Sequence, residues 1–129
     1  MIKKKTAEVV QNLLVSHPKL WDLDFPYRYT VETIIKKGGK TIDKYLTPFG
    51  IRSVKFDKDK GFFLNNKHLK LKGMCLHQDA GCLGTAVPDR AYERRLLILK
   101  EFGTNAIRCS HNPPSPEFLN YCDSIGFWL

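Results

Sequence analysis

The sequence predicts a mixed α and β fold, in which antiparallel β-structure precedes the first strand–helix units of a parallel (β/α)8 barrel. Two apolar strands each end in a histidine, one within LKLKGMCLHQD at 69–79 and the other within NAIRCSHNPP at 105–114. An amphipathic helix is expected between them, over residues 89–102. Strand, helix and strand in this order, with polar residues where the strands end, form the repeat of such a barrel.

Residues 1–56 have the pattern of part of an antiparallel β-sandwich, with too few strands to close one. The alternation of YRYTVETII at 27–35 predicts a strand, Gly38-Gly39 predicts a hairpin turn, and return strands are expected over 40–46 and 49–56. The apolar residues of 6–16 fit either a helix or a bulged strand. A compact hairpin follows over 62–72, with Asn65-Asn66 at its tight turn.

Two helices are marked by the residues at their ends. Asp89 is expected to cap the helix over 89–102, and Gly103 to end it. Ser115 caps a second helix over 115–125, which begins with Pro116 and stops at Gly126. The buried face of the first helix is expected to carry four apolar residues at helical spacing: Tyr92, Leu96, Leu99 and Phe102.

Composition and charge narrow the function classes. The chain is 43% hydrophobic and 26% charged, which is typical of a folded domain. No apolar run approaches the ~20 residues of a membrane span, so no membrane partner is expected. The net charge is +8, and residues 1–72 hold 16 of the 21 Lys and Arg residues. Because these are scattered along strands and turns, they indicate solvated strand edges, and no nucleic-acid partner is expected.

The two ends of the chain carry further signals. The start MIKKK is similar to the first part of a signal peptide, but no continuous apolar segment follows, so none is expected. At 129 residues the chain is shorter than the roughly 250 residues of a complete barrel, and FWL at 127–129 has the pattern of a further strand. We therefore expect a fragment of a larger enzyme.

Three polar residues fall at the strand ends, where such barrels build their active sites: His77, Arg108 and His111. His77 and Arg108 also have structural interpretations. His77 would cap a strand before a glycine-containing loop, and Arg108 would form a structural ion pair with Asp79 or another acid. In the functional interpretation they are fixed hydrogen-bond donors for an oxygen-rich ligand. Asp79 is the only acid expected at the mouth of the barrel, so no catalytic pair of carboxylates is predicted.

The cysteines allow a metal-binding alternative. Cys75-x-His77 and Cys109-x-His111 resemble zinc half-sites, with Cys82 nearby. However, the two- to four-residue gap between cysteines that is typical of structural zinc sites is missing. Cys75 and Cys109 also lie in apolar strand sequence, where a free cysteine behaves as a small hydrophobic residue. No metal site is therefore expected in this chain.

Taken in order, several motifs closely resemble glycoside hydrolase family 2. They are FGIRS at 49–53, GFFLN at 61–65, LKLKG at 69–73, LHQD at 76–79 and the run at 105–114. LW at 20–21 and PYRY at 26–29 resemble the immunoglobulin-like sandwich that precedes the barrel in that family. HQDAGCLG at 77–84 is most similar to bacterial β-galactosidases. The resemblance covers essentially the whole chain.

The resemblance implies an architecture and an activity. Residues 1–56 would be the C-terminal part of an immunoglobulin-like antiparallel β-sandwich, and residues 57–129 the N-terminal hairpin and first two β/α units of a TIM (β/α)8 barrel. The parent would be a retaining hydrolase of terminal β-linked sugars, first of all β-galactosides. The alternatives are a β-glucuronidase or β-mannosidase of the family, and a non-catalytic carbohydrate-binding or interaction module.

The resemblance also implies a substrate-binding set: His77, Asp79, Arg108, His111 and Asn112. The two catalytic glutamates of the family lie on later strands, beyond Leu129, so this fragment is expected to hold no catalytic residue and to be inactive alone. Gln78 departs from the His-His-Asp or His-Glu of many relatives.

The resemblance implies partners as well. The expected partner is a β-linked oligosaccharide or glycoside, and the parent is expected to be oligomeric. No cofactor is expected here, and the ligands of any divalent cation would lie in the full-length parent. The compartment is not fixed between the bacterial cytoplasm, periplasm and exterior.

Overall fold

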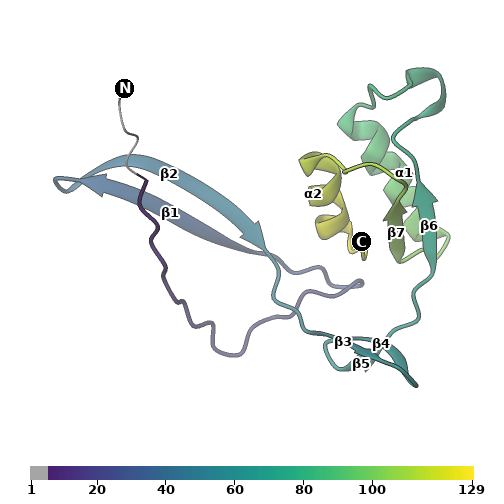
Figure 1. The fold of residues 1–129 in the computed structure, drawn as a ribbon, viewed down its shortest axis with the longest axis horizontal. Coiled ribbons are helices and arrows are strands. Elements are labelled where there is room, and N and C mark those ends of the chain that lie inside the picture. The colour runs from purple at the N-terminus through teal and green to yellow at the C-terminus, as the bar shows by residue number, and fades with distance from the viewer. Residues whose placement is uncertain (1–5) are drawn as a thin grey trace.

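The structure is a computed structural model that describes residues 6–129, so the MIKKK start falls outside the described residues (Figure 1). Seven strands, one short 3-10 helix and two α-helices follow one another along these residues. They are β1 (Tyr29–Lys37), β2 (Lys40–Phe49), β3 (Val54–Asp57), β4 (Gly61–Leu64), β5 (Lys67–His68), β6 (Gly73–Leu76), η1 (Gly81–Leu83), α1 (Asp89–Glu101), β7 (Ala106–Cys109) and α2 (Pro116–Ile125). No helix of the described residues is long and apolar enough to cross a membrane.

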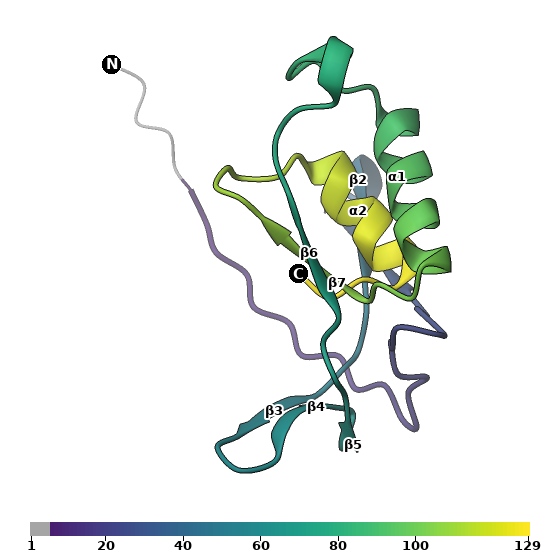
Figure 2. The same cartoon turned by 90° about the vertical axis from the view of Figure 1, so that its right-hand side faces the viewer.

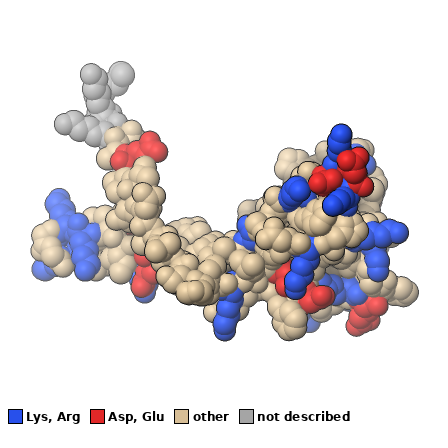
Figure 3. Space-filling model, turned by 90° about the horizontal axis from the view of Figure 1, so that it is seen from below, with Lys and Arg blue, Asp and Glu red and all other residues tan. Residues whose placement is uncertain are grey.

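The hairpin of β1 and β2 projects away from the rest of the molecule (Figure 1). Its strands pair antiparallel from Tyr29 opposite Phe49 to Lys37 opposite Lys40, and Gly38 and Gly39 turn between them with φ of +56° and +78°. The predicted hairpin is therefore confirmed. Figure 3 shows basic side chains at its far tip, and further basic and acidic side chains around the helical part. The segment before the hairpin, residues 6–15, forms neither the helix nor the bulged strand that its apolar pattern allowed.

A second sheet has three antiparallel strands in the order β3-β4-β5. Asn65 and Asn66 form the turn between β4 and β5 with φ of +51° and +64°, as a tight hairpin turn requires. The predicted strand over 49–56 is wrong, because residues 50–53 leave the strand conformation. Trp21 causes this break: its backbone N–H donates to the Ile51 carbonyl at 2.9 Å, and its side chain packs directly on Gly50. β3 starts only after this contact.

The third sheet pairs β6 with β7 in parallel, with Gly73 opposite Ala106 and Leu76 opposite Cys109. The parallel pairing predicted for the two histidine-ended strands is thus confirmed. Trp128 adds a parallel bridge to Ala106, so the chain enters a third strand position beside β7. Helices α1 and α2 lie side by side and pack on the same side of the two strands (Figure 2). Five buried residues form the helical cluster between helices and strands: Leu96, Ile107, Phe118, Cys122 and Phe127.

Helix α1 differs from the prediction at both ends. Its N-cap is Pro88, which makes no side-chain capping bond, and Asp89 is instead the first helical residue. At the other end the helix stops at Glu101, and Phe102 at the C-cap is 84% exposed although helical spacing predicted it to be buried. At 3.6 residues per turn, Phe102 lies about 120° around the helix from Leu96, beyond the edge of the buried face, and its ring turns to solvent.

Helix α2 begins with a capping bond that can be tested. The Ser115 hydroxyl accepts a hydrogen bond from the backbone N–H of Phe118 at 3.2 Å. Replacing Ser115 with alanine leaves that N–H without its partner, so we expect a loss of about 1 kcal/mol in the free energy of unfolding, measured by chemical denaturation. Ser124→Ala is the matched control, because the Ser124 hydroxyl only donates to the Tyr121 carbonyl within the helix and alanine favours helix. Equal losses in both variants would contradict the capping role.

A second set of buried residues, the tryptophan cluster, joins the segment before β1 to the three-stranded sheet. It consists of Trp21, Leu23, Phe62 and Leu64, with Trp128 packed against it. The Arg52 guanidinium lies 4.7 Å from the ring centres of both Trp21 and Trp128. We call this arrangement the Arg52 stack. The Trp21 indole N–H also donates to the Asp123 carbonyl at 2.8 Å, which ties the segment to α2.

Candidate functional site

The carboxyl ends of β6 and β7 lie next to each other. Their last paired residues are Leu76 and Cys109, and the backbone N–H of Ser110 donates to the Leu76 carbonyl at 2.9 Å, which extends the pairing by one residue. His77 and His111 follow directly, so each histidine leaves one of two neighbouring strand ends. The peptide bond between Ser110 and His111 is cis. The local fold therefore delivers both imidazoles to the same edge of the sheet.

The alternation of side chains assigns each residue of these strands to one face. Leu76 and Cys109 pack against the helical cluster. Cys75 and Arg108, which are opposite each other in the register, belong to the other face and are exposed. In a closed parallel barrel with helices outside, this face is the interior. The ion pair of Arg108 with Asp79 or another acid that the sequence allowed is not formed among residues 6–129.

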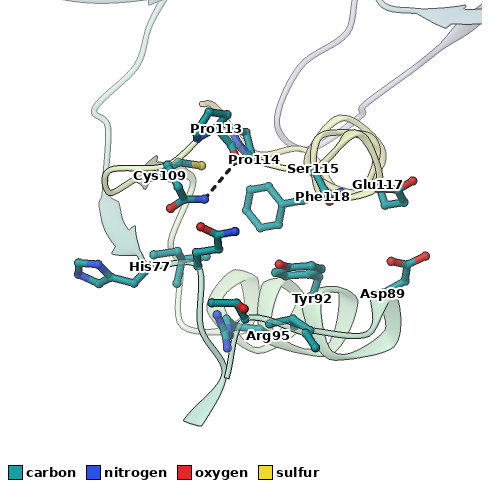
Figure 4. Close-up of a pocket in the computed structure, with 16 residues that line it drawn as sticks. His77, Asp89, Tyr92, Arg95, Cys109, Pro113, Pro114, Ser115, Glu117 and Phe118 are labelled. Carbon is teal, nitrogen blue, oxygen red and sulfur yellow. Dashed lines mark hydrogen bonds between the residues drawn. The ribbon is translucent and has the colours of Figure 1, made fainter. Parts of the chain in front are cut away.

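A cavity of about 350 Å³ lies beyond these strand ends, between the loops and the first turns of α1 and α2. Tyr92 and Phe118 meet edge to face in its wall, with ring centres 5.3 Å apart. Asp89 and Glu117 contribute carboxylates from the helix starts (Figure 4). Figure 4 also shows that the imidazole of His77 points away from the two aromatic rings.

The five residues predicted to bind substrate share this end of the molecule but not one cavity. His77 and Asn112 line the cavity of about 350 Å³. His77 and Asp79 line a second cavity of about 610 Å³, on the η1 side of α1. Arg108 and His111 line neither. Only Asn112 is half-buried, and its amide donates to the Pro113 carbonyl at 3.2 Å.

Sequence reasoning missed Arg95. This residue lines both cavities, and its guanidinium donates to the Asp79 carbonyl at 3.1 Å, which fixes the loop after β6 on α1. Gln78, singled out only as a departure from relatives, lines the first cavity. Helical spacing places Arg95 on α1, but its contact with the loop depends on how the helix packs, for which the sequence carries no signal.

The four cysteines are free thiols in three environments. Burial raises the pKa of Cys122 to about 12, and it also raises the pKa of the half-buried Cys109. The Ser110 hydroxyl, with the Arg108 guanidinium, lowers the pKa of the exposed Cys75. The prediction of an apolar environment is therefore right for Cys109 and wrong for Cys75. The described residues contain no group of three or more His, Cys, Asp or Glu side chains that could hold a metal ion.

Comparison with known protein families defines the class of this chain. Residues 54–129 match the model of the TIM barrel domain of glycosyl hydrolases family 2, and residues 1–52 match a second model of glycosyl hydrolases family 2. The chain belongs to glycoside hydrolase family 2, as the motifs of the sequence indicated.

The names of individual relatives indicate two different activities. The chain is 52% identical over 123 residues to a β-galactosidase of Bacteroides ovatus, covering 95% of this chain and 14% of that protein. It is 38% identical over 126 residues to a β-glucuronidase of Bacteroides fragilis, covering 95% of this chain and 18% of that protein. The chain thus spans less than a fifth of the length of either relative.

Solved structures show the same arrangement. A β-glycosidase of Bacteroides vulgatus superposes with a TM-score of 0.83 at 45% identity, over 85% of this chain and 14% of that one. A family 2 member of Bacteroides cellulosilyticus superposes with a TM-score of 0.81 at 47% identity, over 85% of this chain and 15% of that one.

Proposed function

We propose that this chain is part of a retaining glycosidase that removes terminal β-linked sugars, with β-galactosides as the first substrate class. The observation that carries the proposal is the 52% identity with a β-galactosidase over 95% of the chain. The matches to β-glucuronidases, at 38% and 41% identity, favour β-glucuronides as the second candidate class. The two sugars differ at C6, which is a hydroxymethyl group in galactose and a carboxylate in glucuronic acid, and in the configuration of the C4 hydroxyl.

We further propose that residues 1–56 end an immunoglobulin-like sandwich and that residues 57–129 begin the barrel. The antiparallel β1–β2 hairpin supports the first part, and the parallel β6–β7 pair with its two helices supports the second. The proposed boundary between residues 56 and 57 falls inside β3. Because β3 pairs with β4, which lies on the barrel side of this boundary, the three-stranded sheet would belong with the barrel.

The proposed sugar-binding shell consists of His77, Asp79, Arg108, His111 and Asn112. It is supported by the neighbouring ends of β6 and β7, from which all five residues come. Imidazole and guanidinium N–H groups donate to sugar hydroxyls, and carboxylate and amide oxygens accept from them. Hydrogen bonds that strengthen as charge develops on the sugar lower the barrier. The two carboxylates of a retaining mechanism are proposed to lie outside this chain, so the isolated chain does not hydrolyse glycosides.

The proposal is tested with a chromogenic β-galactoside and the matching β-glucuronide, on the full-length enzyme and on the isolated chain. We expect His111→Ala to lower kcat/KM of the full-length enzyme about 100-fold, which is typical of losing one donor to the transition state. His17→Ala is the control, because His17 is an exposed histidine that precedes β1. We expect the isolated chain to show no turnover above a mock purification.

The outcomes separate the candidates. A higher kcat/KM for the galactoside supports the first substrate class, and a higher value for the glucuronide supports the second. Turnover by the isolated chain would overturn the placement of the catalytic pair. An unchanged kcat/KM in His111→Ala would overturn the assignment of His111 to the sugar-binding shell.

A further inference from the structure

Arg95 ties the loop after β6 to helix α1. Its guanidinium donates a hydrogen bond to the main-chain carbonyl of Asp79 at 3.1 Å, and the residue is half-buried. Its side chain also lines both cavities at this end of the molecule (Figure 4). Both partners of the hydrogen bond belong to one β/α unit, formed by β6 and α1, so the contact does not depend on later strands of a barrel.

Helix α1 gives Arg95 a fixed base. The next residue, Leu96, is 0% exposed and belongs to the helical cluster. Tyr92, one turn earlier, packs edge to face on Phe118 of α2, with ring centres 5.3 Å apart. Because both neighbours are packed against other elements, the backbone at Arg95 cannot shift without disturbing this packing. The helix therefore offers the loop a fixed point of attachment.

The loop of residues 77–88 contains a closed turn next to Asp79. The Ala80 N–H donates to the Gly84 carbonyl at 3.1 Å, which closes the turn. This bond gives the turn its shape but does not fix where the turn lies on α1. The bond from Arg95, made at the residue just before the turn, supplies that position. A charged donor makes this bond roughly twice as strong as one between neutral groups.

The attachment of the loop affects two residues of the proposed sugar-binding shell. The bond from Arg95 uses the main-chain carbonyl of Asp79, so it leaves the carboxylate available to a ligand. His77 lies two residues earlier, on the short connection between β6 and the turn. A shift of the loop therefore moves both groups together. A misplacement of about 1 Å can cost as much as about 100-fold in rate, even when it is caused far from the reacting atoms.

We propose that Arg95 is a positioning residue, which holds the loop after β6 so that His77 and Asp79 meet the sugar. This role rests on the proposed sugar-binding shell and deepens it, because Arg95 acts through the main chain of the loop. A lysine at this position can still donate to the carbonyl, whereas an alanine cannot. Comparison of the two substitutions therefore isolates the contribution of the hydrogen bond.

The test compares Arg95→Ala, Arg95→Lys and Arg94→Ala in the full-length enzyme, with the chromogenic glycoside that it prefers. We expect Arg95→Ala to raise KM about tenfold, and Arg95→Lys to stay within about threefold of the unsubstituted enzyme. Partial unfolding lowers the apparent kcat and leaves KM unchanged, so a rise in KM separates positioning from a loss of folded protein. Arg94→Ala is the matched control, because Arg94 is an exposed arginine of the same helix, and it should leave KM unchanged.

Hydrogen exchange provides a readout that does not depend on turnover. The peptide that covers residues 77–88 should exchange faster in Arg95→Ala than in Arg94→Ala, while peptides from α2 should exchange equally in both variants. Unchanged exchange of this loop in Arg95→Ala would overturn the positioning role. An unchanged KM in the same variant would overturn it as well.

His77→Ala and Asp79→Asn in the same enzyme show which proposal has failed. If either variant lowers kcat/KM while Arg95→Ala does not, the sugar-binding shell stands and the role of Arg95 is wrong. If neither variant lowers kcat/KM, His77 and Asp79 do not belong to the sugar-binding shell, and the positioning role of Arg95 fails with them.

Discussion

Replacing Gly126 with alanine is expected to be among the most destabilising single changes in this chain. Gly126 ends α2 in the left-handed conformation, with φ of +85°. A Cβ at this position would run into the Leu23 carbonyl oxygen and lie 2.9 Å from the Leu23 carbonyl carbon. That carbonyl also accepts the Lys100 ammonium at 2.6 Å, so moving it away would disturb a second contact. The segment around Leu23 could then no longer approach α2.

Gly103→Ala separates the two causes of this expected loss. Gly103 follows α1 with φ of +79°, but a Cβ there would meet no atom within 4 Å. Its substitution should cost only the left-handed backbone, about 1–2 kcal/mol. Gly126→Ala should lower the free energy of unfolding by a further 1–3 kcal/mol, roughly the cost of overpacking a core. Denaturant titration of both variants measures the difference, and equal losses would show that the Leu23 contact is unimportant.

Trp21→Ala is expected to have the second large effect, about 3–5 kcal/mol in the free energy of unfolding, as for other buried tryptophans. Trp21 is 1% exposed and is the largest fully buried side chain. Its removal empties the centre of the tryptophan cluster, deprives the Asp123 carbonyl of the indole N–H, and takes away one side of the Arg52 stack. These contacts hold the segment before β1 against both the three-stranded sheet and α2.

Phe25→Ala is the control for that prediction. Phe25 is an aromatic residue of the same segment, but its side chain is 77% exposed. Surface substitutions of this kind usually change stability by no more than about 0.5 kcal/mol. If Phe25→Ala and Trp21→Ala shift the thermal or denaturant midpoint by similar amounts, the tryptophan cluster does not hold this segment in place.

The elements whose ends are marked by turn or capping residues could be predicted from the sequence. Gly38-Gly39 and Asn65-Asn66 mark hairpin turns by their backbone requirements, and both turns occur where the sequence placed them. Ser115 and Gly126 bracket α2 because capping acts within a few residues. The break at Gly50 was not predictable, because it depends on Trp21, which is distant in the sequence. Residues 6–15 show the same limit, since their apolar pattern predicted a helix or strand, yet nearly all of their apolar side chains are exposed.

Some features of the candidate site could likewise be predicted from local sequence, and others could not. His77 and His111 could be assigned to one edge because two apolar strands joined by a helix pair in parallel. The face of Cys75 could not be assigned, since an apolar run contains no alternation, and its register with Arg108 decides that it is exposed. The contact of Arg95 with the Asp79 carbonyl depends on the position of α1 over the loop, which no local pattern encodes.

The Arg52 stack determines what the intrinsic fluorescence of this protein can report. The chain has two tryptophans, and both lie against the same guanidinium. Their emission therefore reports one location, where the segment before β1, the link between β2 and β3, and the third residue after α2 meet. Unfolding of the projecting β1–β2 hairpin is expected to leave this emission unchanged, because neither tryptophan lies in the hairpin. Tryptophan emission thus follows this junction and does not follow the hairpin.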